Sequence, residues 1–409
     1  MLRAMYSGIG GLRNFQTKLD VIGNNIANVN TFGFKKGRVT FQDLVSQQMS
    51  GASTATATRG GTNPMQIGLG SSLASIDTVQ TQGSLQTTTR DLDIGISGDG
   101  FFIVNNGNQS YYTRAGNFYL DSQGNLVNSN GFFVQGYGVN ADGTINYAGG
   151  VGNLNIPKGM TIPPTATTLS DIRGNLNSAT EVGEGTIVEH YIVDEIGRLH
   201  LLEITFTKSA DNTWSYTVSS SSDSVASVGG GTTGSFTFSS GQLGNNTGTA
   251  ITINFGDPNV NNMTIDIDFS QLTQFERTST ADAYYVDGSF DGTLESYSIS
   301  QSGEIYGVFS NNEVRLLGQI ALANFNNPEG LTKAGNNLYM ASANSGMPQI
   351  GTPGEEGRGS LMGSALEMSN VDLSEEFTEM IVAQRGFQAN TRIITTSDEI
   401  LQELVNLKR

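Results

Sequence analysis

The sequence predicts a mainly β protein with terminal α-helices, in which paired N- and C-terminal coiled-coil-like helices enclose nested β domains, one inserted in another. Three observations predict this fold class. Apolar residues recur at alternating steps of three and four at both ends of the chain, which is typical of helices that pair along a seam. Between the ends, short apolar runs alternate with turn residues, as in β sandwiches and barrels. The 409 residues are enough for several domains.

The first segment, residues 1–33, is expected to be a helix that stops in an asparagine-rich run. The run Asn28–Gly33 supplies stop signals, because Gly33 can adopt a positive φ. Gly8, Gly10 and Gly11 weaken the first turns but would let a neighbouring backbone approach closely. The expected apolar seam of this helix comprises Leu2, Met5, Ile9, Leu12, Phe15, Leu19, Ile22, Ile26 and Val29.

The last segment, residues 366–409, is expected to be a longer helix. Asp372 followed by Glu375 resembles a capping box, which predicts the start of the helix. An ordinary core helix also carries an apolar stripe, but this stripe is long and narrow like a coiled-coil seam. Steps of four and three along it give Leu373, Phe377, Met380, Gln384, Phe387, Thr391, Ile394, Asp398, Leu401 and Val405.

The two ends are therefore expected to pair with each other, with full burial supplied by other copies of the chain. Two helices that pair only with each other leave their remaining faces in water and are marginally stable. We expect the polymerisation interface to comprise Leu2, Met5, Ile9, Leu12, Leu19, Ile22, Ile26, Phe377, Met380, Phe387, Ile394 and Leu401.

The composition between the helices predicts the domain order. Residues 1–33 and 366–409 form the terminal helical domain, and the Ser-, Thr- and Gly-rich stretches 34–72 and 351–365 are expected to be linkers. Residues 73–150 and 283–350 form one β domain. Residues 151–282 form an inserted outer β domain, since Gly149-Gly150 and Pro163-Pro164 mark a boundary.

The charge distribution excludes several classes of function. The chain holds 21 Lys and Arg against 38 Asp and Glu, a net charge of −17, so binding to nucleic acid through phosphate neutralisation is not expected. Residues 1–50 carry +4 and residues 366–409 carry −4, so the ends are complementary and the negative charge belongs to the middle. The absence of cysteine excludes disulfides and thiolate sites. Neither membrane insertion nor a cleavable signal peptide is expected, because no long apolar run occurs.

Few residues suggest chemistry, and we expect no enzyme, cofactor or metal site. His190 and His200 are expected to be structural surface histidines. The residue types of a Ser-His-Asp triad are present, so a triad is not excluded, but no G-x-S-x-G motif accompanies these histidines. Asp287–Gly292 matches the start of an EF-hand loop, yet Ser298 stands where Glu is required, which favours a hairpin turn. The acids that could in principle form a glycosidase pair are indistinguishable from turn acids: Asp91, Asp93 and Asp99.

Two long motifs resemble a known family. Residues 19–35 (LDVIGNNIANVNTFGFK) resemble the N-terminal signature of the bacterial flagellar rod, hook and hook-associated axial proteins, and residues 369–398 resemble their C-terminal signature. Three further stretches, 98–104, 112–118 and 317–331, are similar to the β domain of the family, whereas residues 151–282 carry no recognised signature. The signature residues singled out are Asn24, Asn25, Asn28, Thr31, Gly33, Phe34, Gln384, Arg385 and Asn390.

The resemblance implies a structural polymer outside the cell. It implies self-assembly, with export through the flagellar type III apparatus without a cleaved signal, and contacts with distal rod, hook cap and hook–filament junction proteins. The length favours a hook subunit, a curved flexible tube that transmits torque from rod to filament, because rod subunits lack a large insertion. A distal rod subunit stays an alternative. A secreted β-rich glycan-binding or enzymatic protein is a further alternative. It is less favoured because Trp214 is the single tryptophan on which a sugar ring could stack.

Overall fold

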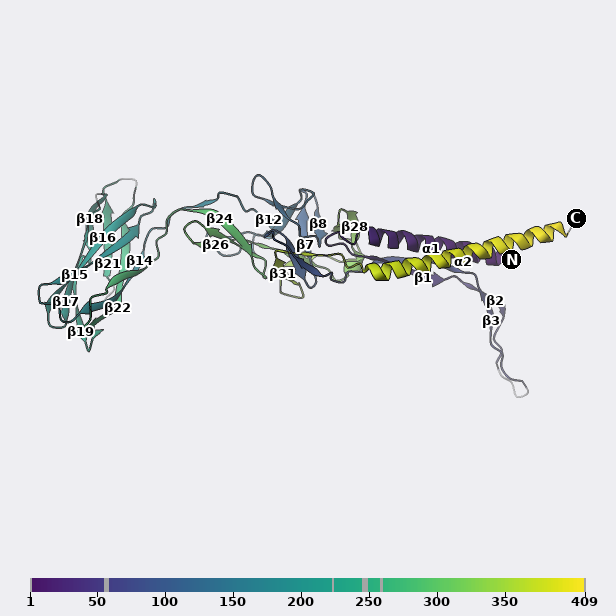
Figure 1. Cartoon of the computed structure of the whole chain (residues 1–409), viewed down its shortest axis with the longest axis horizontal. Coiled ribbons are helices and arrows are strands. Elements are labelled where there is room, and N and C mark those ends of the chain that lie inside the picture. The colour runs from purple at the N-terminus through teal and green to yellow at the C-terminus, as the bar shows by residue number, and fades with distance from the viewer. Residues whose placement is uncertain (1, 55–58, 223, 245–248, 258–259, 408–409) are drawn as a thin grey trace. The chain divides into compact units, whose positions relative to one another are not determined.

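The chain divides into two compact units. The computed structural model describes residues 2–54, 59–222, 224–244, 249–257 and 260–407. Unit 1 contains residues 1–157, 297–306 and 316–409, and unit 2 contains residues 158–296 and 307–315. Unit 1 therefore precedes and follows unit 2 along the chain, and the mainly β fold with terminal helices is confirmed (Figure 1).

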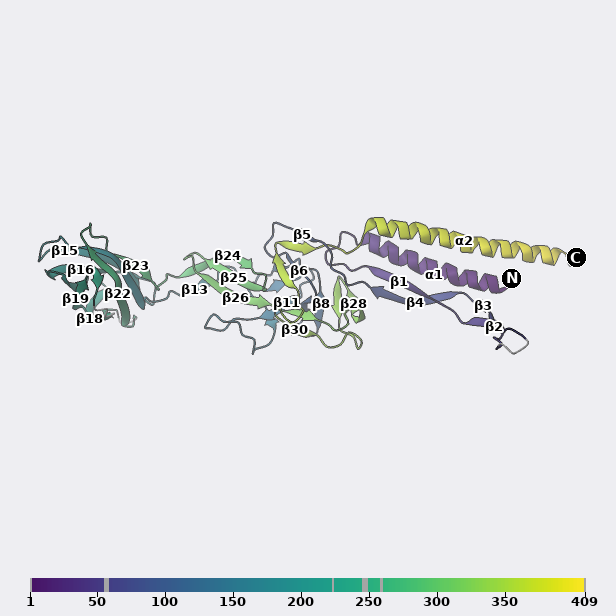
Figure 2. The same cartoon turned by 90° about the horizontal axis from the view of Figure 1, so that it is seen from below.

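Two long helices of unit 1 lie side by side, α1 (Leu2–Ala27) and α2 (Leu373–Asn406) (Figure 2). The Asp372 side chain caps α2 by accepting hydrogen bonds from the backbone N–H groups of Ser374 and Glu375, so the predicted start is confirmed. α1 ends at Ala27, and Gly33 adopts the expected positive φ, 68°, in the turn that follows the helix. Neither of these described helices is apolar enough over a sufficient length to cross a membrane.

The segment after α1 contains strands where the sequence predicted a linker. Strands β1 (Gly37–Asp43) and β4 (Ser71–Thr78) pair in antiparallel fashion and pack on α1. Strands β2 (Ser46–Ser50) and β3 (Met65–Gly68) continue as a second antiparallel pair. The Ser/Thr/Gly composition resembles a flexible linker, but pairing of β1 with β4 over the surface of α1 gives these residues a fixed register.

The β domain of unit 1 has a core of aromatic side chains. In its sheet the hydrogen-bonded order is β26-β11-β7-β8-β29-β28, with β27 paired to both β7 and β30. Phe325 packs edge-on against Phe101 and Tyr112. The strands are β5 (Leu85–Thr87), β6 (Ile94–Ser97), β7 (Phe101–Asn105), β8 (Ser110–Thr113), β9 (Tyr119–Leu120), β10 (Leu126–Val127), β11 (Phe133–Tyr137), β12 (Gly152–Asn153), β26 (Val314–Ile320), β27 (Leu322–Asn324), β28 (Thr332–Gly335), β29 (Leu338–Met340) and β30 (Gln349–Gly351), with a 3-10 turn η1 (Pro328–Gly330).

The second stretch expected to be a linker, residues 351–365, also contains ordered pairing. Strand β31 (Ser360–Gly363) pairs with β6, and β32 (Ala365–Glu367) pairs with β5. These two short pairs place the residues before α2 against the β domain. The chain therefore enters α2 from a fixed position in unit 1.

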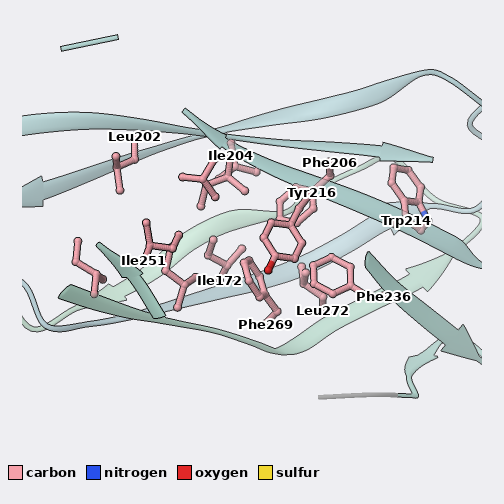
Figure 3. Close-up of a cluster of buried hydrophobic side chains, with 14 of the residues drawn as sticks. Ile172, Leu202, Ile204, Phe206, Trp214, Tyr216, Phe236, Ile251, Phe269 and Leu272 are labelled. Carbon is pink, nitrogen blue, oxygen red and sulfur yellow. The ribbon is translucent and has the colours of Figure 1, made fainter. Parts of the chain in front are cut away.

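Unit 2 is built on one extensive sheet with the path β15-β16-β17-β19-β20-β22-β14-β23. Its core holds the side chain of Trp214 beside Phe236, Phe269 and Tyr216 (Figure 3). The strands are β14 (Leu169–Asn177), β15 (Gly185–Val193), β16 (Leu199–Ala210), β17 (Thr213–Ser220), β18 (Val225–Gly230), β19 (Thr233–Ser239), β20 (Gln242–Leu243), β21 (Thr249–Phe255), β22 (Met263–Phe275) and β23 (Asp282–Val286). Strand β13 (Thr161–Ile162) pairs with β24 (Gly292–Ile299), and β24 and β25 (Glu304–Phe309) have residues in both units.

Candidate functional site

The contact between α1 and α2 is lined by small and polar residues. Gly386 lies against the Phe15 ring, where an added Cβ would be 2.5 Å from the nearest ring carbon, and Gly11 lies against the Asn390 side chain. The glycines therefore permit the close approach that the sequence suggested. Besides Glu379, the buried and half-buried positions of α2 recur at steps of three and four: Glu376, Met380, Ala383, Gly386, Asn390, Ile394, Ser397 and Leu401.

This contact differs from the predicted seam. Met380, Ile394 and Leu401 do lie on the α1 side, but Phe377 is 50% exposed and Phe387 is 37% exposed. The predicted seam followed apolar side chains, whereas α1 packs where α2 offers small side chains. The positions of that seam that are exposed are Leu373, Phe377, Gln384, Phe387, Thr391, Asp398 and Val405.

The N-terminal residues of the expected interface are better placed. Ile22 is buried, and its neighbours along the stripe are half-buried between α2 on one side and β1 and β4 on the other. Leu2 lies in α1, but its side chain falls outside the described part of the chain. The half-buried residues are Met5, Ile9, Leu12, Leu19 and Ile26.

Apart from Val405, the exposed apolar side chains of α2 and of its C-cap residue Leu407 fall into two rows. The first, here called the heptad row, comprises Val382, Ile393, Ile400 and Leu407. The second, here called the phenylalanine row, comprises Leu373, Phe377, Ile381 and Phe387. At 3.6 residues per turn the two rows lie on opposite flanks of the contact with α1. Together they leave a large apolar area in water, which marks an interaction surface.

Charged side chains lie next to the heptad row, and one of them, Arg385, also lies one turn after Ile381 of the phenylalanine row. Arg385, Arg392, Glu399 and Glu403 lie beside the heptad row, in the positions that flank a coiled-coil seam. The heptad row repeats every seven residues over its last three members, so the sequence contained this signal, but the more apolar stripe through Leu373 obscured it. The heptad row therefore has the pattern of an unfilled second helix seam.

A second exposed apolar surface was missed by the sequence prediction. Residues 44–54 and 59–69, here called the hairpin arm, contain β2 and β3, and every residue of these two strands is exposed. Arg59 is the single charged residue in this stretch of sequence. That scarcity of charge beside recurring large apolar residues was the available signal. The exposed large side chains of the arm are Leu44, Val45, Met49, Met65, Ile67 and Leu69.

A buried ion cluster joins the two ends of the chain to the β domain. Lys35 Nζ lies 2.6 Å from Glu367 Oε1 and donates to the Thr81 carbonyl at 2.7 Å. Arg114 Nη1 lies 3.3 Å from Glu367 Oε2, and the Gly83 N–H also donates to this carboxylate. Burial lowers the pKa of Lys35, although the charge of Glu367 opposes the shift. The cluster fixes the start of β1 and the segment before α2 in one place.

Several signature residues serve the same junction. Asn25 bridges the backbone of Gly37 and the buried carboxylate of Glu376, with 3.1 Å between Asn25 Nδ2 and Glu376 Oε2. Burial raises the pKa of Glu376, while the hydrogen bond from Asn25 and the charge of Lys36 oppose the rise. The Gly33 N–H donates to the Glu367 carbonyl. These contacts are structural, within one copy of the chain.

The remaining signature residues divide between local and exposed positions. Thr31 donates to the Asn28 side chain at the end of α1, and Asn390 meets Gly11 across the helix contact. Phe34 is buried below the Lys333 ammonium. The exposed members are Asn24, Gln384 and Arg385.

The two histidines are buried, so their expected position at the surface is wrong. His190 is enclosed in the core of unit 2, where burial lowers its pKa to about 4. His200 Nε2 lies 3.0 Å from Asp194 Oδ2, and its Nδ1 lies 2.9 Å from Ser224 Oγ. The fold does assemble a Ser-His-Asp array. Because the imidazole is 1% exposed and hydrogen-bonded at both nitrogens, the array pins the β15–β16 turn to the start of β18.

The acids considered for catalysis or metal binding have local structural partners. Asp93 pairs with Arg90, and Asp91 accepts a hydrogen bond from Ser364. Burial would raise the pKa of Asp287, but hydrogen bonds from Thr168 and Leu169 outweigh it and lower the pKa. In the described ranges, no group of three His, Asp or Glu residues is arranged to hold a metal ion.

Sequence profiles of four flagellar domain families match consecutive parts of the chain. The Flagella basal body rod protein profile matches residues 5–35, and the Flagellar hook protein FlgE/F/G D1 domain matches residues 95–173. The Flagellar basal body protein FlaE D2 domain matches residues 153–289, and the Flagellar basal body rod FlgEFG protein C-terminal profile matches residues 362–407. The matches therefore include most of both helices, the first part of the β domain and the inserted domain.

Full-length relatives agree with these profiles. The chain is 42% identical to the flagellar hook protein FlgE of Borreliella burgdorferi and 40% identical to that of Treponema pallidum, over 100% of both chains in each case. It is 38% identical to the flagellar basal-body rod protein FlgG of Bacillus subtilis over the same full coverage. The crystal structure of Helicobacter pylori flagellar hook protein FlgE2 shares the fold, with a TM-score of 0.52, 17% identity, and coverage of 69% of this chain and 100% of that one. The chain belongs to the flagellar FlgE/F/G family of hook and basal-body rod proteins.

Proposed function

We propose that the chain is the structural subunit of a bacterial flagellar hook, a curved flexible tube of many copies that transmits motor torque from rod to filament. The observation that carries the proposal is the heptad row, an apolar seam on α2 that its own α1 leaves uncovered. The names of the full-length spirochaete relatives support a hook over other assemblies. A catalytic role is not part of the proposal.

The physical drive for polymerisation comes from the two rows of α2. Burying an Ile or Leu side chain contributes about 1.5–3 kcal/mol, and the heptad row offers Ile393, Ile400 and Leu407 in each copy. The bordering charges Arg385, Arg392, Glu399 and Glu403 set register between neighbouring helices. Because α1 and α2 of one copy bury only one seam, further copies supply the rest.

The proposal includes the place and route of assembly. The tube forms outside the cell after export through the flagellar type III apparatus without cleavage of a signal peptide. The chain has no cysteine, so no disulfide interferes with passage in an unfolded state. Its ends contact the distal rod, the hook cap and the hook–filament junction proteins, and its side contacts are other copies of itself.

A distal rod subunit is the second candidate, because one full-length relative is a basal-body rod protein. The two candidates differ in what unit 2 does. A hook subunit deleted in residues 158–296 should still assemble with altered curvature, since unit 1 carries the helices. In a rod subunit the same deletion should leave straight assembly unchanged.

Electron microscopy of the purified full-length chain tests the proposed function. In concentrated ammonium sulfate, which strengthens apolar burial, we expect short curved tubes with a central channel. Straight tubes would favour the distal rod. A chain that remains monomeric, with tubes absent at all salt concentrations, would overturn the proposal.

A further inference from the structure

We infer that a polar pocket in unit 1 binds a neutral saccharide. The pocket, here called the asparagine pocket, has a volume of about 580 Å³, which lies in the range of small-ligand sites. It is formed by the residues that follow α1, the residues that follow β8, and the β10–β11 and β28–β29 turns. The inference goes beyond the proposed function and does not depend on it. Six asparagines line the pocket: Asn28, Asn30, Asn117, Asn130, Asn336 and Asn337.

The lining of the asparagine pocket is polar but uncharged. None of its ten lining residues, all of which lie in the described ranges, is acidic or basic. A phosphate, a carboxylate or a metal ion would therefore lose its water there without gaining a counter-charge. Asparagine amides offer both hydrogen-bond donors and acceptors, and each hydroxyl group of a saccharide also donates and accepts. The lining thus favours an uncharged ligand that is rich in hydroxyl or acetamido groups.

Most of the amides in the pocket are free to bind a ligand. Phe32 is half-buried and adds one aromatic ring to the lining, and the C–H face of a sugar can pack on such a ring. Convergent polar groups beside an apolar surface are typical of a small-molecule site. The side chains to which the structure gives no hydrogen-bond partner within the described residues are those of Asn30, Asn117, Asn130 and Asn336.

The walls of the pocket are fixed within the chain. Asn337 Nδ2 donates to the Phe32 carbonyl, and the Thr113 hydroxyl donates to the Asn337 carbonyl. The Asn128 side chain accepts a hydrogen bond from the backbone N–H of Asn130, which holds the β10–β11 turn. Fixed walls lower the entropic cost of binding, so a small number of uncharged contacts is sufficient.

Nuclear magnetic resonance of the full-length monomer, prepared with isotope-labelled asparagine in low salt, tests the inference. The probes are chitotriose, which carries acetamido groups, and maltotriose, which carries hydroxyl groups only. At least one of these sugars should shift the side-chain amide signals of the pocket, with a dissociation constant in the millimolar range. Binding of chitotriose alone would assign the recognition to the acetamido group, and binding of both would assign it to the hydroxyl groups.

Amide variants locate the site. Asn336→Gly keeps the β28–β29 turn, because Asn336 has a φ of 52° and glycine adopts a positive φ without strain. Combined with Asn30→Ala, it removes two free amides and should weaken sugar binding about tenfold. The matched control combines Asn312→Gly, at a left-handed turn of unit 2 with a φ of 62°, and Asn24→Ala, on the exposed surface of α1. Sugar binding by the control should equal that of the unaltered chain.

Two results would overturn the inference. One is the absence of shifted amide signals with both sugars at tens of millimolar. The other is equal affinity for sugar in the pocket variant and the control variant. Both measurements use the monomer, so either result would leave the proposed function standing. Failure of the unaltered chain to form tubes would instead overturn the proposed function and leave the sugar site standing.

Discussion

Lys35 Nζ lies 2.6 Å from Glu367 Oε1, and both side chains are closed to solvent. The two residues are separated by most of the chain, yet they join the segment that leaves α1 to the segment that enters α2. Arg114 of the β domain reaches the other oxygen of Glu367. One carboxylate therefore ties the segments next to both helices to the β domain.

Replacing that carboxylate should be strongly destabilising. Glu367→Gln leaves Lys35 and Arg114 buried without a counter-charge, so the free energy of unfolding of unit 1 should fall by about 3–5 kcal/mol. Glu375→Gln is the matched control, because its ion pair with Lys36 is exposed and should contribute less than about 1 kcal/mol. Denaturant unfolding followed by far-ultraviolet circular dichroism measures both. Equal losses in the two variants would contradict the role given to Glu367.

Gly386 provides a second test, at the helix contact. Alanine is the better helix former by about 1 kcal/mol, but a Cβ at this position overlaps the Phe15 ring. Gly386→Ala should therefore destabilise by a net amount of up to about 2 kcal/mol. Gly23→Ala in α1, where a Cβ meets no atom within 4 Å, should instead stabilise.

Thermal unfolding followed by helix signal compares the two glycine variants. The change in thermal stability should have opposite signs in Gly386→Ala and Gly23→Ala. Combining Phe15→Ala with Gly386→Ala should restore the stability that the overlap removes. A stabilised Gly386→Ala variant would show that α1 and α2 do not pack as closely as described.

His190 should make unit 2 sensitive to acid. Burial lowers the pKa of His190 from 6.5 to about 4, so the unfolded chain binds a proton more readily than the folded chain between these values. The stability that neutral, buried His190 contributes to the folded state is fully present above pH 6.5. It is lost as the pH falls through this window, by about 3 kcal/mol in all. Neither ring nitrogen has a hydrogen-bond partner in the structure, so His190→Leu should remove this pH dependence without leaving a polar group unpaired.

Tryptophan fluorescence measures the effect, since Trp214 is the single tryptophan and lies in the core of unit 2. Unfolding curves at pH 7 and pH 4.5 should converge for His190→Leu and diverge for the unaltered chain. An equal loss of stability in acid for both chains would assign the acid sensitivity to other groups.

The sequence was informative where one side chain determines the local geometry. Asp372 as a helix cap and the positive φ of Gly33 are confirmed, because capping and a positive φ are local requirements. The face of α2 that meets α1 was predicted only in part, since apolar periodicity cannot indicate that Gly386 lies against the Phe15 ring. The buried array of Asp194, His200 and Ser224 depends on strand pairing, which residue counts do not reveal.

The hairpin arm illustrates the same limit. A stretch rich in Ser, Thr and Gly resembles a linker in composition, and only the pairing of β2 with β3 shows that its residues are held in a ribbon. The heptad row was present in the sequence but was masked by the stronger stripe of Leu373 and Phe377. The seam positions that remain exposed in one copy include both apolar residues such as Phe377 and polar residues such as Gln384.

The central claim is that α2 holds an unfilled apolar seam that drives polymerisation. The most direct measurement is electron microscopy and sedimentation of the full-length Ile393→Asp, Ile400→Asp double variant beside the unaltered chain in concentrated salt. Both side chains are exposed in the single copy, so we predict unchanged unfolding of the monomer and loss of tubes. Tubes formed at the same protein concentration as by the unaltered chain would contradict the account.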